Sequence, residues 1–319
     1  MQIKTSVIQK AVICGLCVAF VGGVAVPSST VFAASSADKA QAKELYKNAF
    51  SSYKSGNFIA AADGFISANK LDEENPLFAL SAGDMLCRLK QYESSIMYYK
   101  KAVNNLRHAP KGTKDRATLQ TYEGLSKAYL ESGDKQKAIE AAEEVTKLFG
   151  KKYNGYYMLG KIYASDHLDD TKAIENFNKA LDMDDTQLPV YASLSDLYKQ
   201  KNDMVGMEST LKRGCLARPL DEAMKVALGR LYLEWNDNGK NHYDKAEQVF
   251  KDLIGLDEKS AWGHYYLGES YLLQGKFDQA SNELSLLSSL NGNLANRLQK
   301  EMQERADAQP SETTITVNQ

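Results

Sequence analysis

Apolar and polar positions follow one another along this chain with helical spacing, in short blocks separated by polar turns. Residues 265–280 read YYLGESYLLQGKFDQA, in which apolar and aromatic residues recur three or four positions apart on both sides of the turn QGKFD. This spacing predicts two amphipathic helices joined by a turn. Gly268 lies inside the first predicted helix, where glycine costs roughly 1 kcal/mol relative to alanine. Close contact with a second helix explains such a glycine, because a larger side chain would hold the helices apart.

The same two-helix pattern recurs through most of the chain. The first predicted helix of each block carries a small residue at an equivalent position, and these residues are Ala49, Gly83, Ser126, Gly160, Ser195, Gly229 and Gly268. Their spacings are 34, 43, 34, 35, 34 and 39 residues, which indicates a 34-residue period with insertions. Glycines also recur in the turns, at Gly56, Gly133 and Gly275, where left-handed backbone is easy. A period of this length is typical of a solenoid, in which each repeat packs on its neighbours.

This unit resembles the tetratricopeptide repeat, whose 34-residue pattern is W-x2-L-G-x2-Y followed by A-x3-F. The resemblance is carried best by LGKIY (159–163), LGRLY (228–232) and LGESY (267–271), and tyrosine usually replaces the leading tryptophan. It implies an all-α, right-handed solenoid of about seven helix–turn–helix repeats over residues 34–291. It also implies that the first helices line a concave face, and that the protein has interaction or assembly roles.

In each first helix, three residues share the side that would form this concave face. They lie three residues before, one residue after and four residues after the small residue. We expect partner-binding residues at and beside these positions, namely Tyr46, Phe50, Tyr53, Leu80, Asp84, Arg88, Tyr157, Lys161, Arg230, Trp262 and Tyr265. Aromatic residues at the two ends suit peptide anchoring, although aromatics of end repeats can equally pack against neighbouring segments. The lysine and asparagine positions with which chaperone-binding relatives hold a C-terminal carboxylate are not matched here.

The first 33 residues have the layout of a secretory signal peptide. A basic start with two lysines precedes an apolar run at residues 11–26, and VFA then provides a small-x-small pattern. We therefore expect cleavage between Ala33 and Ala34. The alternative is an uncleaved membrane anchor, although the apolar run is shorter than the span of about 20 residues that a bilayer requires.

The C-terminal end also departs from the repeats. Residues 292–306 predict an amphipathic helix that caps the last open apolar face, as repeat arrays require. Residues 307–319 are expected to form a disordered tail. The insertion at residues 234–245 predicts a hairpin extension between two repeat helices.

Composition and motifs argue against several classes of function. A formal charge of −2 gives no electrostatic case for binding nucleic acid. Outside the signal segment only Cys87 and Cys215 remain, about four repeats apart, so we expect no disulfide between them. The chain has no HExxH, GxSxG, Walker or GxGxxG motif, and we predict neither a metal site nor a cofactor.

The sequence therefore predicts a non-catalytic scaffold or assembly adaptor in a bacterial cell envelope, periplasmic or extracellular, that binds a protein or peptide through its concave face. We expect no membrane span after removal of the signal segment. Two alternatives stay open: an accessory protein that binds cell-wall glycan, and a self-associating structural protein. The sequence does not specify the partner or the oligomeric state.

Overall fold

A computed structural model describes residues 34–108 and 111–308 of the chain. The predicted signal segment, including Ala33 on one side of the expected cleavage point, and most of the predicted tail lie outside these residues. The described part contains fifteen α-helices, and their bounds are α1 (Ser36–Lys54), α2 (Phe58–Leu71), α3 (Pro76–Arg88), α4 (Tyr92–Leu106), α5 (Lys111–Glu131), α6 (Lys135–Leu148), α7 (Asn154–Ala164), α8 (Asp170–Met183), α9 (Leu188–Gln200), α10 (Met204–Ala217), α11 (Glu222–Glu234), α12 (Tyr243–Leu256), α13 (Ala261–Leu273), α14 (Phe277–Leu290) and α15 (Gly292–Ala308).

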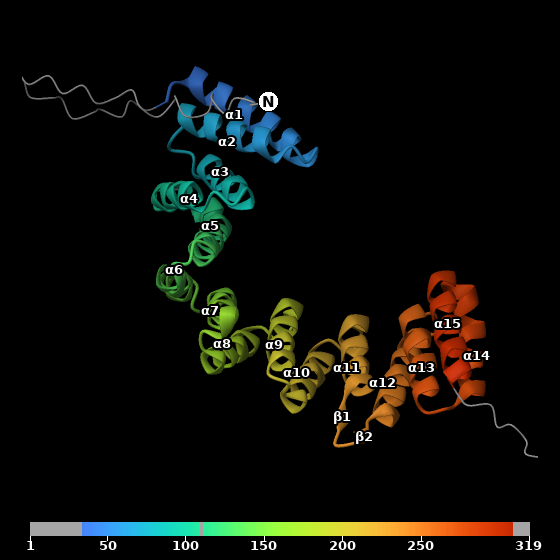
Figure 1. Cartoon of the computed structure of the whole chain (residues 1–319). Coiled ribbons are helices and arrows are strands. Elements are labelled where there is room, and N and C mark those ends of the chain that lie inside the picture. Colours follow the sequence, from blue (N-terminus) through green and yellow to red (C-terminus); the bar gives the residue numbers. More distant parts are fainter. Residues whose placement is uncertain (1–33, 109–110, 309–319) are drawn as a thin grey trace, which may run out of the picture.

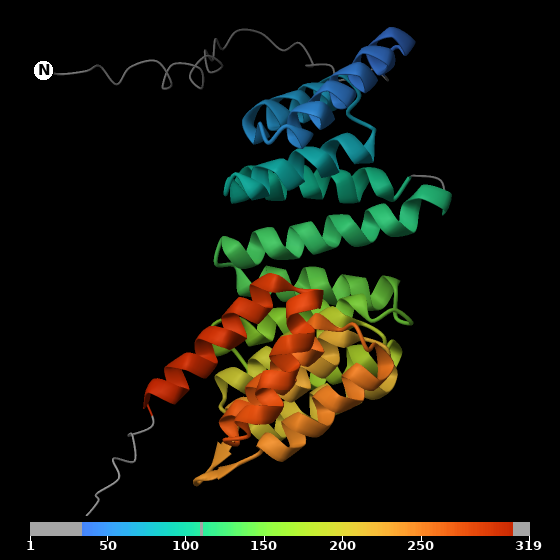
Figure 2. The same cartoon turned by 90° about the vertical axis from the view of Figure 1, so that its right-hand side faces the viewer.

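Consecutive helices pack as antiparallel pairs, and the pairs stack into a right-handed solenoid, which confirms the predicted fold class. Figure 1 shows the stack as an arc, in which, from α3 to α12, the first helix of each pair lies on the inside and the second helix on the outside. In Figure 2, which is turned by 90°, the N-terminal pairs lie one above another as layers. We call the surface formed by the first helices the inner face.

The small residues of the first helices mark points of close helix contact. A Cβ atom on Gly160 of α7 would lie 2.6 Å from the Phe177 ring of α8, which is too close for any real contact. At the equivalent position of α5, the Ser126 hydroxyl donates a hydrogen bond to the Ala138 carbonyl of α6 at 3.0 Å. These contacts confirm why the repeats accept small residues inside helices, because packing between the helices outweighs the helix-propensity cost.

The turns between the two helices of a pair follow a common design. Gly56, Gly133 and Gly275 have positive φ angles of 80°, 90° and 73°, as the sequence predicts. An Asn or Asp that follows the glycine caps the second helix in two of these turns, where Asn57 and Asp134 accept a backbone N–H three residues on. Such a cap stabilises the start of a helix by about 1 kcal/mol.

Two insertions change the length of the repeats. The 43-residue spacing is accommodated by α5, which has 21 residues. The first helices α3, α7, α9, α11 and α13 are shorter, with 11 to 13 residues each. The 39-residue spacing is accommodated by a short antiparallel hairpin of β1 (Asn236–Asp237) and β2 (Lys240–Asn241), as predicted. Near residue 167, a short 3-10 helix (Ser165–His167) joins α7 to α8.

Helix α15 covers the C-terminal end of the solenoid and contacts both α13 and α14. Leu294 and Leu298 of α15 are buried there. A Cβ on Gly268 would lie 2.6 Å from Leu298, whereas the nearest atom of the second helix of its own repeat, Glu283 Cβ, would be 3.5 Å away. The Gly268 contact therefore differs from the prediction, since α15 rather than α14 makes the closest approach.

Over the described residues, every helix is too short or too polar to cross a membrane.

Candidate binding groove on the inner face

The inner face exposes only part of the predicted binding set. Asp84, Arg88, Lys161 and Arg230 are exposed to solvent, and Tyr53 and Tyr157 are half-buried. Phe50 and Trp262 expose 44% and 42% of their surface, which is unusual for side chains of this size and apolar character. Seven of these eight residues therefore remain available to a partner, whereas the Asp84 carboxylate accepts a hydrogen bond from Tyr99 of α4.

The other three predicted binding residues pack within the fold. Leu80 and Tyr265 are buried, with 5% and 0% exposure, and the Tyr265 hydroxyl donates to Glu301 Oε1 of α15 at 2.7 Å. Tyr46 lies between Phe65 and Phe78, with ring centroids 5.1 Å from each. A partner therefore has little direct access to Leu80 and Tyr265, whereas Tyr46 is half-buried.

A cavity of about 330 Å³ opens at the centre of the inner face, between α5 and α7. Its floor is apolar, formed by Leu130, Met158 and Ile162, of which the last two are buried. Tyr157 forms one wall, and its hydroxyl lies 3.4 Å from the Ser193 hydroxyl of α9. We call this hollow the central cavity.

The rim of the central cavity carries charges of both signs. Lys127 of α5 and Lys161 of α7 line it together with Glu123 and Glu131. Within the described part of the chain, neither lysine has a carboxylate at ion-pair distance, and the Lys161 ammonium lies 5.5 Å from the Tyr157 ring centroid. The two ammonium groups therefore keep donors free on a surface that also offers an apolar floor.

A second feature lies at the N-terminal end of the inner face. Phe50 and Tyr53 of α1 and Phe58 of α2 form a row of rings, with successive centroids 5.9 Å and 6.0 Å apart. The Arg88 guanidinium of α3 lies 4.1 Å from the Phe58 centroid, and the Lys54 ammonium lies 5.1 Å from the Phe50 centroid. We call these three rings the aromatic row. Phe58 was missed by the sequence reasoning because it belongs to a second helix.

The C-terminal end of the inner face is also aromatic. The Trp262 and Tyr266 rings are stacked, with centroids 5.6 Å apart, and the Arg230 guanidinium lies 5.9 Å from the Tyr266 centroid. Burial raises the pKa of the nearby Glu269 carboxyl above its usual value, and the neighbouring Glu301 carboxylate adds to this effect. This end therefore combines one exposed ring, that of Trp262, with charges of both signs.

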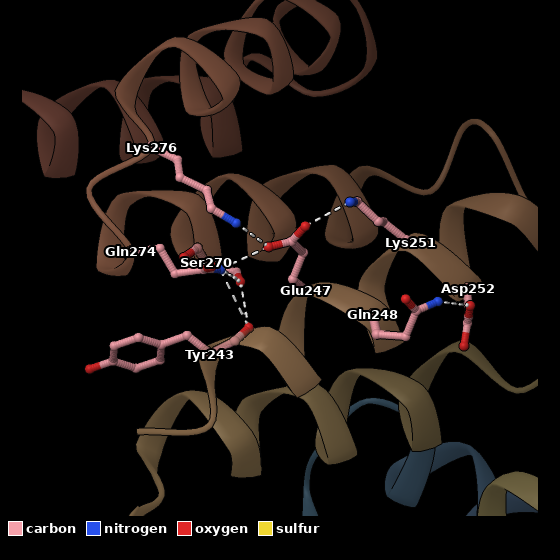
Figure 3. Close-up of polar contacts among 8 residues, drawn as sticks. All are labelled: Tyr243, Glu247, Gln248, Lys251, Asp252, Ser270, Gln274 and Lys276. Atoms are coloured by element: carbon pink, nitrogen blue, oxygen red, sulfur yellow. Dashed lines mark hydrogen bonds and ion pairs between the residues drawn. The ribbon is translucent and has the colours of Figure 1, made fainter. Parts of the chain in front are cut away.

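A polar network joins the last two repeats on their outer side (Figure 3). Glu247 of α12 accepts hydrogen bonds from Lys251 at 2.6 Å, from Lys276 at 2.8 Å and from Gln274 at 3.0 Å. Burial alone would raise the pKa of Glu247, but these three donors outweigh it and lower the pKa to about 2. The network links α12 to α13 and to the turn before α14, so its role is structural.

Two further cavities lie between successive outer helices, one beside α4, α5 and α6 and one beside α10, α11 and α12. The second is lined in part by Cys215, which is half-buried, while Cys87 is buried beneath the inner face. Burial raises the pKa of both thiols, the opposite of what a thiolate nucleophile requires. In residues 34–108 and 111–308, no three His, Cys, Asp or Glu side chains converge as metal ligands do.

Sequence models described as tetratricopeptide repeat match residues 77–151, 124–187 and 239–301, which together make up more than half of the chain. No curated protein sequence matches the chain.

Solved structures share the fold at low sequence identity. The C-terminal part of a TPR repeat-containing protein from Cytophaga hutchinsonii is 14% identical, with a TM-score of 0.50 over 79% of this chain and 98% of that one. A tetratricopeptide repeat protein from Parabacteroides merdae is 17% identical, with a TM-score of 0.45 over 83% and 99%. Pseudomonas aeruginosa pilF is 13% identical, with a TM-score of 0.41 over 83% and 99%. At 14% identity, the likeness to the Cytophaga hutchinsonii protein shows the fold alone.

Proposed function

Because the chain belongs to the tetratricopeptide-repeat family, whose fold supports a role as a protein-interaction scaffold, we propose that it is a non-catalytic adaptor that binds a protein or peptide along its inner face. The observation that carries this proposal is the central cavity between α5 and α7. It combines an apolar floor, an aromatic wall and two lysines that have no ion-pair partner among the described residues, on the side of the solenoid that its curvature makes concave.

The geometry of the central cavity suits a peptide better than a flat protein surface. Its volume of about 330 Å³ is at the lower end of the range for ligand pockets, which is enough to bury one or two apolar side chains. Apolar anchors provide most of the binding energy at such sites, while charged rims fix orientation and suppress wrong partners. We therefore expect one apolar anchor of the partner on Leu130 and Ile162, with polar groups of the partner meeting Lys127 and Lys161.

We further propose that the adaptor acts in the cell envelope, after export and removal of residues 1–33. The support is the basic, apolar and small-x-small order of that segment, which lies outside the described residues. N-terminal sequencing of the protein purified from its own cells tests this directly. A mature chain that begins at Ala34 agrees with the proposal, and an intact Met1 contradicts it.

Site-specific photo-crosslinking tests the binding surface. A photoreactive amino acid replaces Lys127 on the rim of the central cavity, and a matched probe replaces Lys179, which is exposed on the outer helix α8. Irradiated cells should give a discrete protein adduct from position 127 and none from position 179. The same adduct from both positions, or from 179 alone, would move binding away from the inner face.

A charge reversal then tests whether the crosslinked protein binds at the central cavity. Lys161→Glu should reduce the yield of the adduct at position 127, because it replaces a free donor at the rim with a carboxylate. Lys179→Glu is the matched control and should leave the yield unchanged. Circular dichroism of both variants checks that the helices are retained.

A cell-wall glycan is the second candidate ligand, and the exposed Trp262 ring favours it. Stacked beside Tyr266, this ring offers an apolar face that sugar rings could cover. Soluble cell-wall fragments titrated against the protein should then bind, and Trp262→Ala should abolish the binding. Absence of binding by wild-type protein would leave the peptide adaptor as the proposal.

A further inference from the structure

Two cations, Arg88 and Lys54, lie beside the aromatic row. Within residues 34–108 and 111–308, no carboxylate lies at ion-pair distance from Arg88 or Lys54. Both side chains instead lie near rings of the row, Arg88 over Phe58 and Lys54 over Phe50. The row therefore has exposed apolar surface with a free positive charge at each end.

Asp84 would be the natural partner of Arg88, since it precedes Arg88 by one helical turn on α3. Its carboxylate is already engaged, because the Tyr99 hydroxyl of α4 donates to Asp84 Oδ1 at 2.7 Å. That bond lies between two helices, and Tyr99 is also the ring against which Gly83 packs. Asp84 is thus held by the helix pair, and the Arg88 guanidinium is left to rest on Phe58.

We propose that this end of the groove binds an acidic peptide segment, with Arg88 holding a carboxylate and the aromatic row holding an apolar side chain next to it. The inference rests on the proposed peptide-binding function and specifies the chemistry of the partner. The aromatic row would give the peptide a second anchoring point besides the central cavity. The row begins on α1, and the cavity begins at α5, two first helices further along the inner face.

The geometry of Arg88 favours a carboxylate over other groups. The delocalised guanidinium is planar, and its fork of N–H groups matches the two oxygens of a carboxylate. Stacking also restricts the side chain before binding, so less rotamer entropy is lost when the hydrogen bonds form. A lysine at this place would provide charge without the fork.

Charge complementarity excludes a basic segment and indicates where the acidic residues of the partner lie. Lys54 at the opposite end of the row would meet a second carboxylate, with the apolar side chain of the partner between the two. Phe50 is 44% exposed, more than the half-buried Tyr53 and Phe58. A neutral sugar could stack on Phe50 but would leave the Arg88 donors unused.

A selection from random peptides displayed on phage tests the proposal. The protein is expressed from its full-length gene, purified through a C-terminal tag and immobilised, and peptides enriched on it are synthesised for calorimetry. We expect the enriched peptides to combine an apolar residue with neighbouring Asp or Glu. Their affinity should fall about tenfold or more in Arg88→Gln and remain weakened in Arg88→Lys, because a charge-assisted bidentate contact is lost.

The controls separate this site from the rest of the groove. Lys179→Gln on outer helix α8 should bind as wild type does, and Phe50→Ala should bind more weakly. Enriched peptides without acidic residues, or equal affinity in Arg88→Gln, would overturn the inference and leave the adaptor function standing. A wild-type protein that enriches no peptide at all would overturn the proposed function itself.

Discussion

The Phe177 ring of α8 lies against Gly160 of α7 so closely that a Cβ at position 160 would be 2.6 Å from it. This contact relates the 34-residue pattern of the sequence to the packing of the solenoid, because the glycine allows the ring to fill the space between two helices. Phe177 is 1% exposed, so it has no room to move aside.

We expect Gly160→Val to destabilise the protein by about 1 to 3 kcal/mol through overpacking, even though glycine is a poor helix former. Gly255→Ala is the matched control, because Gly255 lies in α12 with open space around it. That change should leave stability unchanged or raise it by up to about 1 kcal/mol. Urea denaturation followed by circular dichroism measures both, and an equal effect of the two changes would contradict the packing argument.

The seven small residues and their spacing were sufficient to predict the fold, since a repeat specifies both its helices and its neighbours. The candidate site was only partly predictable. The period shows which side of its own helix a residue occupies, but it does not show how far the next helix covers that side. Leu80 and Tyr265 therefore have the expected positions on their helices, yet neighbouring helices bury both.

The sequence pattern does not predict side-chain contacts between different repeats. Arg88 of α3 contacts Phe58 of α2, in the preceding repeat, and no fixed spacing indicates that this pair meets. The central cavity and the contact of Arg88 with the aromatic row depend on such contacts, which arise only once the helices are stacked.

The Glu247 network gives a pH-dependent contribution to stability. Because folding lowers the pKa of Glu247 from 4.5 to about 2, its contribution is fully present above pH 4.5 and is lost as the pH falls towards 2. We expect Glu247→Gln to reduce stability at neutral pH by about 1 to 2 kcal/mol, an amount limited by solvent screening of the two lysines. The difference from wild type should shrink between pH 4.5 and pH 2 in urea denaturation series.

Glu304→Gln provides the comparison for this measurement. The Glu304 side chain is 63% exposed and lies 3.5 Å from Lys300, a contact that solvent screens. Its replacement should leave the pH dependence close to that of wild type. A Glu247→Gln variant that is as stable as wild type at neutral pH would show that the network contributes nothing.

His264 of α13 is a buried residue whose two ring nitrogens both face acceptors. Nδ1 lies 2.6 Å from Glu283 Oε2 and Nε2 lies 3.0 Å from the Glu258 carbonyl oxygen. We expect His264→Ala to destabilise the protein by about 3 kcal/mol or more, because it leaves the largely buried Glu283 side chain without its partner.

An exposed histidine pair serves as the control for that change. His167 lies 3.0 Å from Asp170, and the His167 side chain is 53% exposed. His167→Ala should change stability by less than about 1 kcal/mol. Thermal unfolding of the two variants under the same conditions compares them, and equal shifts would show that burial of the His264 pair adds nothing.

The packing of α15 on the last repeat should be necessary for stability at the C-terminal end. Leu298 is fully buried and lies against Gly268, so Leu298→Ala should cost about 2 to 5 kcal/mol. Lys300, two residues on, has a side chain that is 77% exposed, and Lys300→Ala should be almost neutral. Amide hydrogen exchange should show faster opening of α13 and α14 in the leucine variant alone.

The central claim is that the inner face binds the partner, and amide hydrogen exchange with and without the partner identified by crosslinking tests it most directly. We expect the partner to slow exchange in α5 and α7, which line the central cavity, and to leave the outer helices α6 and α8 unchanged. Protection confined to the outer helices, with α5 and α7 unaffected, would contradict the account.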